Sequence, residues 1–242
     1  MNRYQASRAA FLILSLWYVA SLKKSWELSI HWQGAMICRT GEAMNIIYVL
    51  DLIGTAAFAA SGAWVGVRKQ MDLFGVLVLG IVTAVGGGTL RDLLLGDIPP
   101  FSLADETYIY IAIIVSLFVF ANRKQFKAFE KPLLYFDAIG LGTFVVIGTT
   151  KALDFQLGIL GAVLMGVMTG TAGGVIRDIL ANQVPLILRR EIYASACVVG
   201  GVLLVALEYS GASRPVSALL AASTVILIRL LAIYYDWALP KS

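Results

Sequence analysis

The chain repeats itself at a constant spacing of 86 residues. Both copies place glycines before an Arg-Asp pair within an apolar stretch, Gly86-Gly87-Gly88-Thr89-Leu90-Arg91-Asp92 and Ala172-Gly173-Gly174-Val175-Ile176-Arg177-Asp178. The same offset, with no gap, relates six further pairs: Asp51 and Asp137, Gly54 and Gly140, Gly62 and Gly148, Gly80 and Gly166, Thr83 and Thr169, Pro99 and Pro185. The core of a soluble protein rarely contains two such charged, glycine-rich clusters in equivalent apolar segments. A membrane protein that builds a polar path between two halves does contain them.

The composition places the chain in a bilayer. Hydrophobic residues make up 59% and charged residues 14%, whereas an ordinary globular protein has about 45–50% and about 25%. The mean hydropathy is +0.82. The net charge of +4 does not indicate nucleic-acid binding, because the basic residues lie between apolar segments and form no continuous patch.

Several kinds of site are excluded by what the sequence lacks. Cys38, Cys197 and His31 are the only cysteines and histidine, too few for a zinc site or a disulfide framework, although a single bridge stays open. The glycine runs lack the phosphate-loop pattern, and His31 lies outside the repeat, so no triad is expected. We expect neither a metal site nor an enzyme; an intramembrane hydrolase or transferase built on the aspartates is the minor alternative.

Apolar windows of about 20 residues predict membrane spans. Seven such windows are found, at residues 45–67, 74–96, 107–121, 133–150, 157–180, 191–208 and 216–236. The third is short for about 30 Å of hydrocarbon, although Tyr108 and Tyr110 suit the interface at its start. We therefore predict an all-α polytopic membrane protein with a seven-helix core.

Residues 1–43 precede the repeat and differ from it. Arg3 and Arg8 come before an apolar run at 9–22, which is too short to span comfortably and fits a signal-like or interfacial segment. The alternative that we favour is that Met44 is the natural start and that these residues are an upstream extension.

Lysine and arginine residues predict the orientation. They gather in the loops 68–73, 122–132 and 181–190 and in the tail, which ends with Lys241, whereas the opposite loops are mainly acidic. The positive-inside rule therefore puts the C-terminus in the cytoplasm. With three windows in each copy, the second copy enters the membrane from the opposite side, so the two are inverted repeats with their functional site near the midplane.

Consecutive glycines inside a span weaken a helix by about 1 kcal/mol each and permit a kink or unwinding. Gly86, Gly87 and Gly88 lie past the middle of the second window, and Gly173 and Gly174 occupy the matching place in the fifth. We interpret these glycines as functional kinks in a polar path between the two halves. The alternative is close helix packing, as small residues such as Gly166 and Gly170 also allow.

The Arg-Asp pairs are expensive inside a membrane, at about 2.5–3.5 kcal/mol for each charge. Neighbouring residues point about 100° apart on a helix, so Arg91 and Asp92 are not expected to pair with each other. We predict reciprocal pairing across the repeats instead, Arg91 with the second half and Arg177 with the first. The alternative is that the two pairs, Arg91-Asp92 and Arg177-Asp178, anchor helix ends at the lipid headgroups.

Asp51 and Asp137 lie in the first and fourth windows. Together with the two Arg-Asp pairs they give four acidic and two basic groups, an excess that favours a cation if all are ionised. A protonated aspartate or a helix cap is the alternative for either residue. Three threonines are candidates to line a polar route, although each alternatively bonds to its own helix: Thr83, Thr169 and Thr171. Arg229 in the last window is expected to snorkel toward the cytoplasmic side.

These residues resemble a known family. Duplicated three-helix halves, each with a Gly-Gly-x-x-Arg-Asp signature, and a seventh helix are similar to the prokaryotic trimeric intracellular cation channels, the TRIC family. The resemblance covers about residues 44–238, and residues 1–43 have no counterpart. It divides the chain into an extension at 1–43, repeats at 44–131 and 132–212, and a seventh helix and tail at 213–242.

The resemblance implies a homotrimer in the bacterial inner membrane in which every protomer has its own potassium-conducting pore. It places the kinks at Gly86–Gly88 and Gly173–Gly174, with the Arg-Asp pairs fixing the helices around the pore. No cofactor is implied beyond permeant potassium or sodium ions and a bound lipid. Because the second copy has Ala172 in place of Gly86, the two kinks need not be equal.

Bacterial sequences of this family have also been labelled transporters of glycine. Inverted repeats with broken helices are common in secondary transporters as well. A secondary transporter of glycine or another small amino acid is therefore the alternative function, and the sequence does not separate it from a channel.

Overall fold

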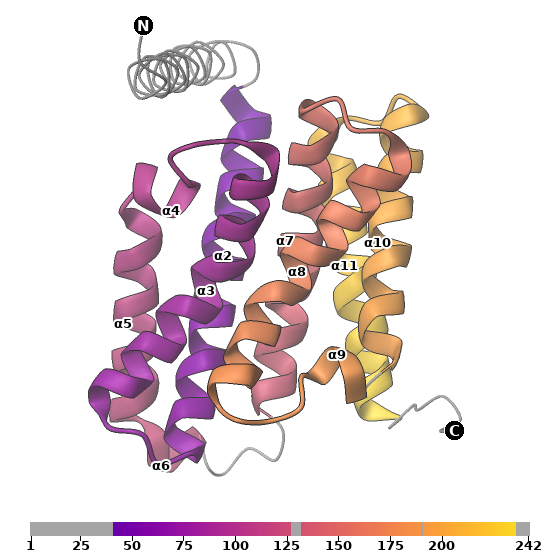
Figure 1. The fold of residues 1–242 in the computed structure, drawn as a ribbon. Coiled ribbons are helices and arrows are strands. Elements are labelled where there is room, and N and C mark those ends of the chain that lie inside the picture. The colour runs from indigo at the N-terminus through magenta and orange to yellow at the C-terminus, as the bar shows by residue number, and fades with distance from the viewer. Residues whose placement is uncertain (1–40, 127–131, 190, 236–242) are drawn as a thin grey trace, which may run out of the picture.

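The computed structural model describes residues 41–126, 132–189 and 191–235, and within these every regular element is a helix (Figure 1). The helices are α2 (Gly41–Arg68), α3 (Leu73–Leu95), α4 (Phe101–Ala104), α5 (Thr107–Ala121), α6 (Arg123–Phe126), α7 (Pro132–Asp154), α8 (Ile159–Leu180), α9 (Leu186–Arg189), α10 (Glu191–Tyr209) and α11 (Arg214–Tyr234). The predicted all-α class is confirmed for these residues. The predictions for residues 1–40 and for Lys241 lie outside them.

Six of the described helices are long and apolar enough to cross a membrane: α2, α3, α7, α8, α10 and α11. The seventh predicted window corresponds to α5, which is apolar but has only 15 residues, about 22 Å at about 1.5 Å for each residue. The predicted window 133–150 ends too early, because α7 continues through the charged Lys151 to Asp154.

The turns after equivalent helices match residue by residue. Gln70 after α2 and Gln156 after α7 both adopt a left-handed conformation, with φ of 57° and 58°. Gly96 after α3 and Asn182 after α8 do the same, with φ of 73° and 51°. In all four turns an amide donates a hydrogen bond to the carbonyl five residues earlier, as in a Schellman motif. The 86-residue period therefore extends from the sequence to the backbone of the turns.

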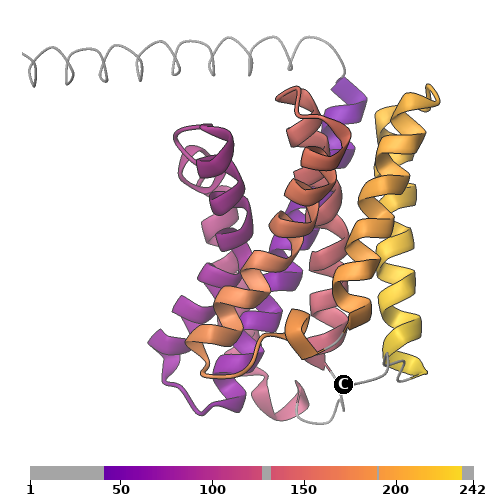
Figure 2. The same ribbon diagram turned by 45° about the vertical axis from the view of Figure 1, so that its right-hand side comes forward.

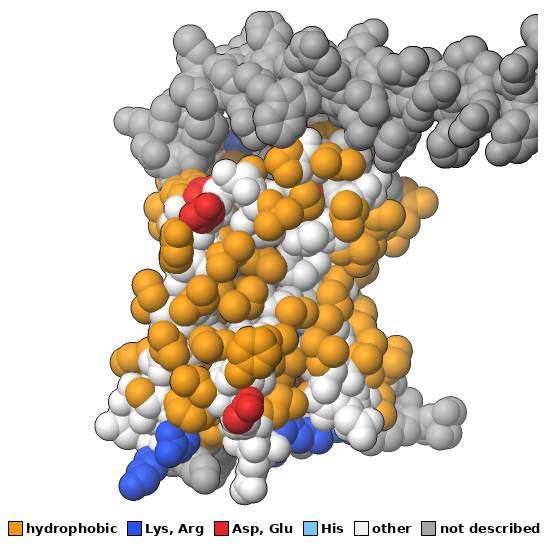
Figure 3. All heavy atoms as spheres, turned by 60° about the vertical axis from the view of Figure 1, so that its left-hand side comes forward, with side chains coloured by type: hydrophobic (Ala, Val, Ile, Leu, Met, Phe, Trp, Pro, Cys, Tyr) orange, Lys and Arg blue, Asp and Glu red, His pale blue; other side chains and the backbone are white. Residues whose placement is uncertain are grey.

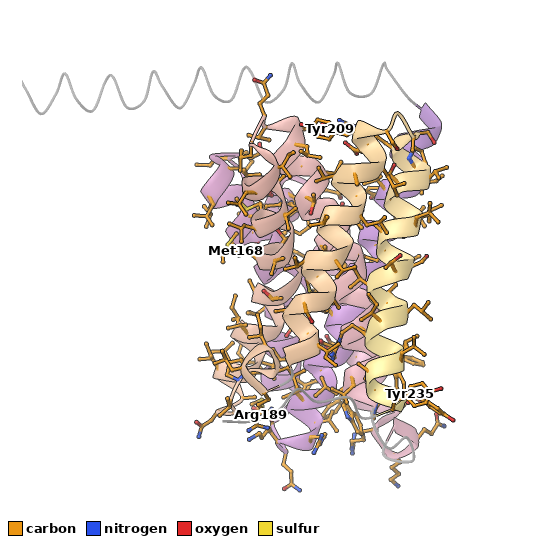
Figure 4. The ribbon with its side chains drawn as sticks, turned by 90° about the vertical axis from the view of Figure 1, so that its right-hand side faces the viewer. Met168, Arg189, Tyr209 and Tyr235 are labelled. Carbon is orange, nitrogen blue, oxygen red and sulfur yellow. The ribbon has the colours of Figure 1, made fainter. Side chains whose placement is uncertain are left out.

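The helices form an upright bundle in which the chain direction alternates. In Figure 1, α2 and α5 descend while α3 rises, and α7 and α10 rise while α8 descends. The turned view of Figure 2 keeps α10 and α11 together at one side of the bundle. Figure 4 places Arg189 and Tyr235 at one end and Tyr209 at the other.

Apolar side chains cover the outside of the bundle. Figure 3 shows them as a broad band, with lysine and arginine side chains near one end of the molecule. Many large apolar residues are exposed, among them Phe74, Leu103, Ile114, Leu160 and Leu188. Water would penalise such a surface, whereas lipid or a further copy of the chain covers it without cost.

Two phenylalanines meet where α2 packs against α7. The rings of Phe58 and Phe144, 86 residues apart, are stacked with centroids 5.2 Å apart and planes 18° apart. A methyl group on Gly140 would clash with the Phe58 ring, and one on Gly54 would contact the Phe144 ring at 3.2 Å. The two halves therefore contact each other through equivalent residues.

The helices α3 and α8 cross in backbone contact at their glycines. A methyl group on Gly87 would clash with the carbonyl oxygen of Thr169, and one on Gly173 would clash with that of Thr83. Both helices are continuous through these positions, so the unwinding that the glycines permit does not occur here. At Gly87 and Gly173 the close-packing role, considered above as the alternative, is what the structure shows.

Candidate functional site

The two Arg-Asp pairs lie near the C-terminal ends of α3 and α8. These helices run in opposite directions (Figure 1), so the pairs lie at opposite ends of the bundle. All four side chains are buried. The structure therefore contains two charge clusters, a first around Arg91 and Asp92 and a second around Arg177 and Asp178.

Each arginine pairs with the aspartate that follows it. Arg91 Nε lies 2.7 Å from Asp92 Oδ1, and Arg177 Nε lies 2.8 Å from Asp178 Oδ1. The prediction that such neighbours do not pair is wrong. Their Cβ atoms diverge, but the long arginine side chain folds back far enough to present Nε to the carboxylate.

The same aspartates also hold the segment that follows each helix. The Phe101 amide donates to Asp92 Oδ2 at the start of α4, and the Leu186 amide donates to Asp178 Oδ2 at the start of α9, both at 2.8 Å. Each carboxylate thus neutralises an arginine and satisfies a free backbone donor. This role of the two aspartates was not predicted, although the repeated Pro99 and Pro185 mark the two equivalent loops.

In the first cluster the ion pair between the halves comes from Lys151. Its Nζ lies 2.6 Å from Asp92 Oδ1 and 2.5 Å from Asp97 Oδ2. The prediction that Arg91 pairs with the second half is wrong: its guanidinium lies 5.4 Å from the centroid of the Phe101 ring, which belongs to its own half. Lys151 is not among the predicted site residues, because the predicted window ends one residue before it, at residue 150.

Asp51 lies close to the first cluster but is held by a tyrosine. The Tyr108 hydroxyl donates to Asp51 Oδ2 at 3.0 Å. Asp51 Oδ1 is buried and has no hydrogen-bond partner among the described residues. Asp51 and Asp137 occupy equivalent positions in the two repeats, but Asp51 is bonded to a tyrosine hydroxyl.

In the second cluster Arg177 binds three groups. Its Nη1 lies 2.6 Å from Asp137 Oδ1 and donates to Ser61 Oγ at 3.0 Å, in addition to the Asp178 pair. Its side chain and that of Asp137 are 0% exposed. Arg177 therefore reaches the first half, as predicted, but through a neutral hydroxyl, while both of its charged partners belong to its own half.

Arg229 also belongs to this region. It is 2% exposed, and its Cζ lies 4.8 Å from the centroid of the Tyr193 ring. The prediction that Arg229 snorkels to the cytoplasmic side is wrong, because a cation over an aromatic face inside the bundle is stabilised where it lies. Small buried residues of α11, such as Ala218 and Ala222, let the helix approach closely.

Lys151 and Arg229 change the charge balance that the sequence indicated. Arg91, Arg177, Lys151 and Arg229 now stand against five aspartates, Asp51, Asp92, Asp97, Asp137 and Asp178. If all are ionised, four positive and five negative charges leave one negative charge. The predicted acidic excess of two is therefore reduced to one when the groups are counted by position in space.

The threonine hydroxyls bond to their own helices. Thr83 Oγ1 and Thr169 Oγ1 donate to the Leu79 and Met165 carbonyls at 2.6 Å, and Thr171 Oγ1 to the Met168 carbonyl at 3.5 Å. All three residues are buried. The structure thus shows the alternative role, a hydrogen bond to the threonine's own helix. That these threonines line a polar route stays a prediction.

Lys151 provides a test of the first cluster. Lys151→Met removes one of the two charged partners that Asp92 has among the described residues. It also removes the ion pair between Lys151 and Asp97. Because the lysine side chain is 22% exposed, we expect a loss of about 1 kcal/mol, between a surface and a buried pair. Thermal unfolding in detergent measures it, with Lys151→Arg as the control that keeps the charge. A loss as large as that of Arg177→Met would contradict the assignment.

Comparisons with known proteins agree with this arrangement. The family model described as "Glycine transporter" matches residues 48–124 and 134–209, two segments that begin 86 residues apart. The UPF0126 inner membrane protein YadS of Escherichia coli (strain K12) is 44% identical over 197 residues, which cover 81% of this chain and 95% of YadS.

Solved structures are similar as well. A TRIC cation channel is 42% identical with a TM-score of 0.74, over 80% of this chain and 96% of that one. The TRIC trimeric intracellular cation channel orthologue from Rhodobacter sphaeroides is 38% identical with a TM-score of 0.76, over 79% of this chain and 99% of that one. The chain, which the Glycine transporter model matches, therefore belongs by sequence and by structure to the TRIC family of membrane proteins.

Proposed function

We propose that the protein is a potassium-conducting cation channel in which each protomer carries its own pore between two inverted three-helix repeats. The observation that carries this proposal is the similarity, at 42% and 38% identity over nearly whole chains, to solved TRIC cation channels. In this proposal α5 is the third of seven spans, residues 44–131 and 132–212 form the repeats, and residues 213–242 lie outside them.

Inverted repeats are supported by three independent features. The turns recur 86 residues apart with the same left-handed residues. The family model matches two segments at that offset. The chain directions of α2, α3 and α5 are reversed in α7, α8 and α10 (Figure 1). An odd number of spans in each copy requires that reversal.

The proposed path passes the crossing of α3 and α8, with one charge cluster toward each end. Gly87 and Gly173 bring the two backbones into contact, so conduction requires the helices to part there. Kinks at Gly86–Gly88 and at Gly173 and Gly174 are the proposed means, because glycine bends at the lowest cost. The stacked Phe58 and Phe144 rings lie beside this crossing.

Assembly and orientation form part of the same proposal. The Rhodobacter sphaeroides relative is a trimeric channel and YadS is an inner membrane protein, which supports a homotrimer in the bacterial inner membrane, surrounded by lipid. Five basic residues lie at one end of the bundle, at the end of α2, in the turn after it, or in the short helices α6 and α9: Arg68, Lys69, Arg123, Lys124 and Arg189. The positive-inside rule makes that end, and the C-terminus, cytoplasmic. We propose no nucleic-acid partner.

Flux into proteoliposomes tests the proposal against transport of glycine. With the purified full chain, we expect potassium flux that rises in proportion to its concentration, together with no uptake of labelled glycine. A channel offers a continuous route, whereas a transporter saturates. Saturable glycine uptake without potassium flux would reject the channel.

A further inference from the structure

Four polar atoms in and beside the second cluster are buried without a hydrogen-bond partner among the described residues. They are Asp137 Oδ2, Arg177 Nη2, Tyr193 Oη and Arg229 Nε. Of these, Tyr193 Oη also lies within reach of the Asp137 carboxylate. Their residues are between 0% and 2% exposed. Buried polar groups in native proteins are nearly always satisfied, by protein or by ordered water, so four orphans close together indicate a bound molecule.

Three of these residues surround the position that a Cβ atom would occupy at Gly174. A methyl group there would lie 3.1 Å from Tyr193 Oη and 3.5 Å from both Arg177 Nη2 and Asp137 Oδ1. The equivalent Gly88 of the first half faces the Phe101 ring, which a methyl group would clash with. The space beside Gly174 is therefore lined by polar atoms, whereas its counterpart is filled by an aromatic ring.

Arg229 closes this region from outside the repeats. It comes from α11, and its guanidinium packs on the Tyr193 ring. Two carboxylates, Asp137 and Asp178, are balanced by two guanidiniums, so the side chains carry no net charge if all are ionised. A metal cation would face two guanidiniums there, and an anion would face the free oxygen of Asp137.

We propose that Asp137, Arg177, Tyr193 and Arg229 form a buried binding site for water beside Gly174. Water suits the site because the unpartnered atoms include two donors, one acceptor and one hydroxyl that does both, and a water molecule accepts and donates two bonds each. The site hydrates the second cluster and joins α11 to the repeats. It lies within one protomer and holds whether or not the protein conducts ions.

Radiolytic hydroxyl-radical footprinting of the full chain in nanodiscs tests the proposal. Bound water generates radicals next to the side chains that hold it, so Tyr193 is expected to be labelled several-fold faster than its burial allows. Tyr108 is the internal reference, because it is also buried but its hydroxyl is bonded to Asp51. Labelling of Tyr193 no faster than that of Tyr108 would overturn the proposal.

A matched pair of variants strengthens the test. Gly174→Ala places a methyl group among the polar atoms, so labelling of Tyr193 is expected to fall several-fold. Gly161→Ala, in the same helix, contacts only the Leu157 side chain at 3.4 Å or more and is expected to change nothing. Equal labelling in both variants would count against the site, and the wild-type comparison stands if Gly174→Ala does not fold.

Crystals soaked in rubidium separate water from a cation. Water gives electron density beside Gly174 with no anomalous signal, as we expect. A rubidium peak within hydrogen-bonding distance of Asp137 Oδ2 and Tyr193 Oη would show that the site binds a cation and would overturn the proposal.

Discussion

Gly87→Ala is expected to destabilise the folded protein by about 2 kcal/mol or more and to reduce its yield. The added methyl group would clash with the Thr169 carbonyl oxygen of α8, and a backbone atom in a packed crossing has little room to move. Overpacking costs about 1–3 kcal/mol and occasionally more. A clash with a backbone atom falls at the top of this range, which leaves a net loss of about 2 kcal/mol after the gain of about 1 kcal/mol from replacing a helical glycine. Thermal unfolding in detergent measures the change.

Gly86→Ala is the matched control. A methyl group on Gly86 meets only the Cδ1 atom of Ile176 at 3.1 Å, the end of a flexible side chain that gives way easily. The second copy already carries Ala172 at this position. Gly86→Ala is therefore expected to fold like the wild type, and equal stability of the two variants would show that the crossing is not tightly packed.

Arg177→Met is expected to cost about 3–5 kcal/mol, the usual loss when one partner of a buried ion pair is removed. Asp137 would lose its only charged partner among the described side chains, and Asp178 would lose its arginine as well. Both carboxylates would then be buried without an ion-pair partner among the described side chains. Loss of folded protein in detergent, followed by size-exclusion chromatography and thermal unfolding, is the measurement.

Arg91→Met is the comparison that isolates the mechanism. Asp92 keeps Lys151 at 2.6 Å, so the same substitution in the first half is expected to cost clearly less. The double variant Arg177→Met with Asp137→Asn is expected to regain part of the loss, since it removes the uncompensated charge. A larger loss for Arg91→Met than for Arg177→Met would contradict the described partners.

The helices were predictable because their signals are local. Long apolar windows and charged loops mark the positions of α2, α3, α7, α8, α10 and α11 to within a few residues. The 86-residue offset also points correctly to matching residues, such as the left-handed Gly96 and Asn182. Both the apolar windows and the 86-residue offset can be read directly from the sequence, without knowledge of how the helices pack.

The partners of the charged residues were not predictable in the same way. Lys151 and Arg229 lie outside the Arg-Asp motif, and only packing brings them to Asp92 and Tyr193. The repeat suggested equivalent partners in the two halves, but equivalent residues have different ones. Asp137 pairs with Arg177, whereas Asp51 accepts a hydrogen bond from Tyr108. Contacts between distant helices depend on their packing and on side-chain conformations that the motif does not contain.

Planar-bilayer recording of the purified protein under a potassium chloride gradient tests the proposed channel most directly. We expect discrete unitary currents that reverse toward the potassium equilibrium potential and that millimolar glycine leaves unchanged. Bilayers that stay silent although the protein is inserted, or currents that reverse toward the chloride potential, would contradict a cation channel built on these two halves.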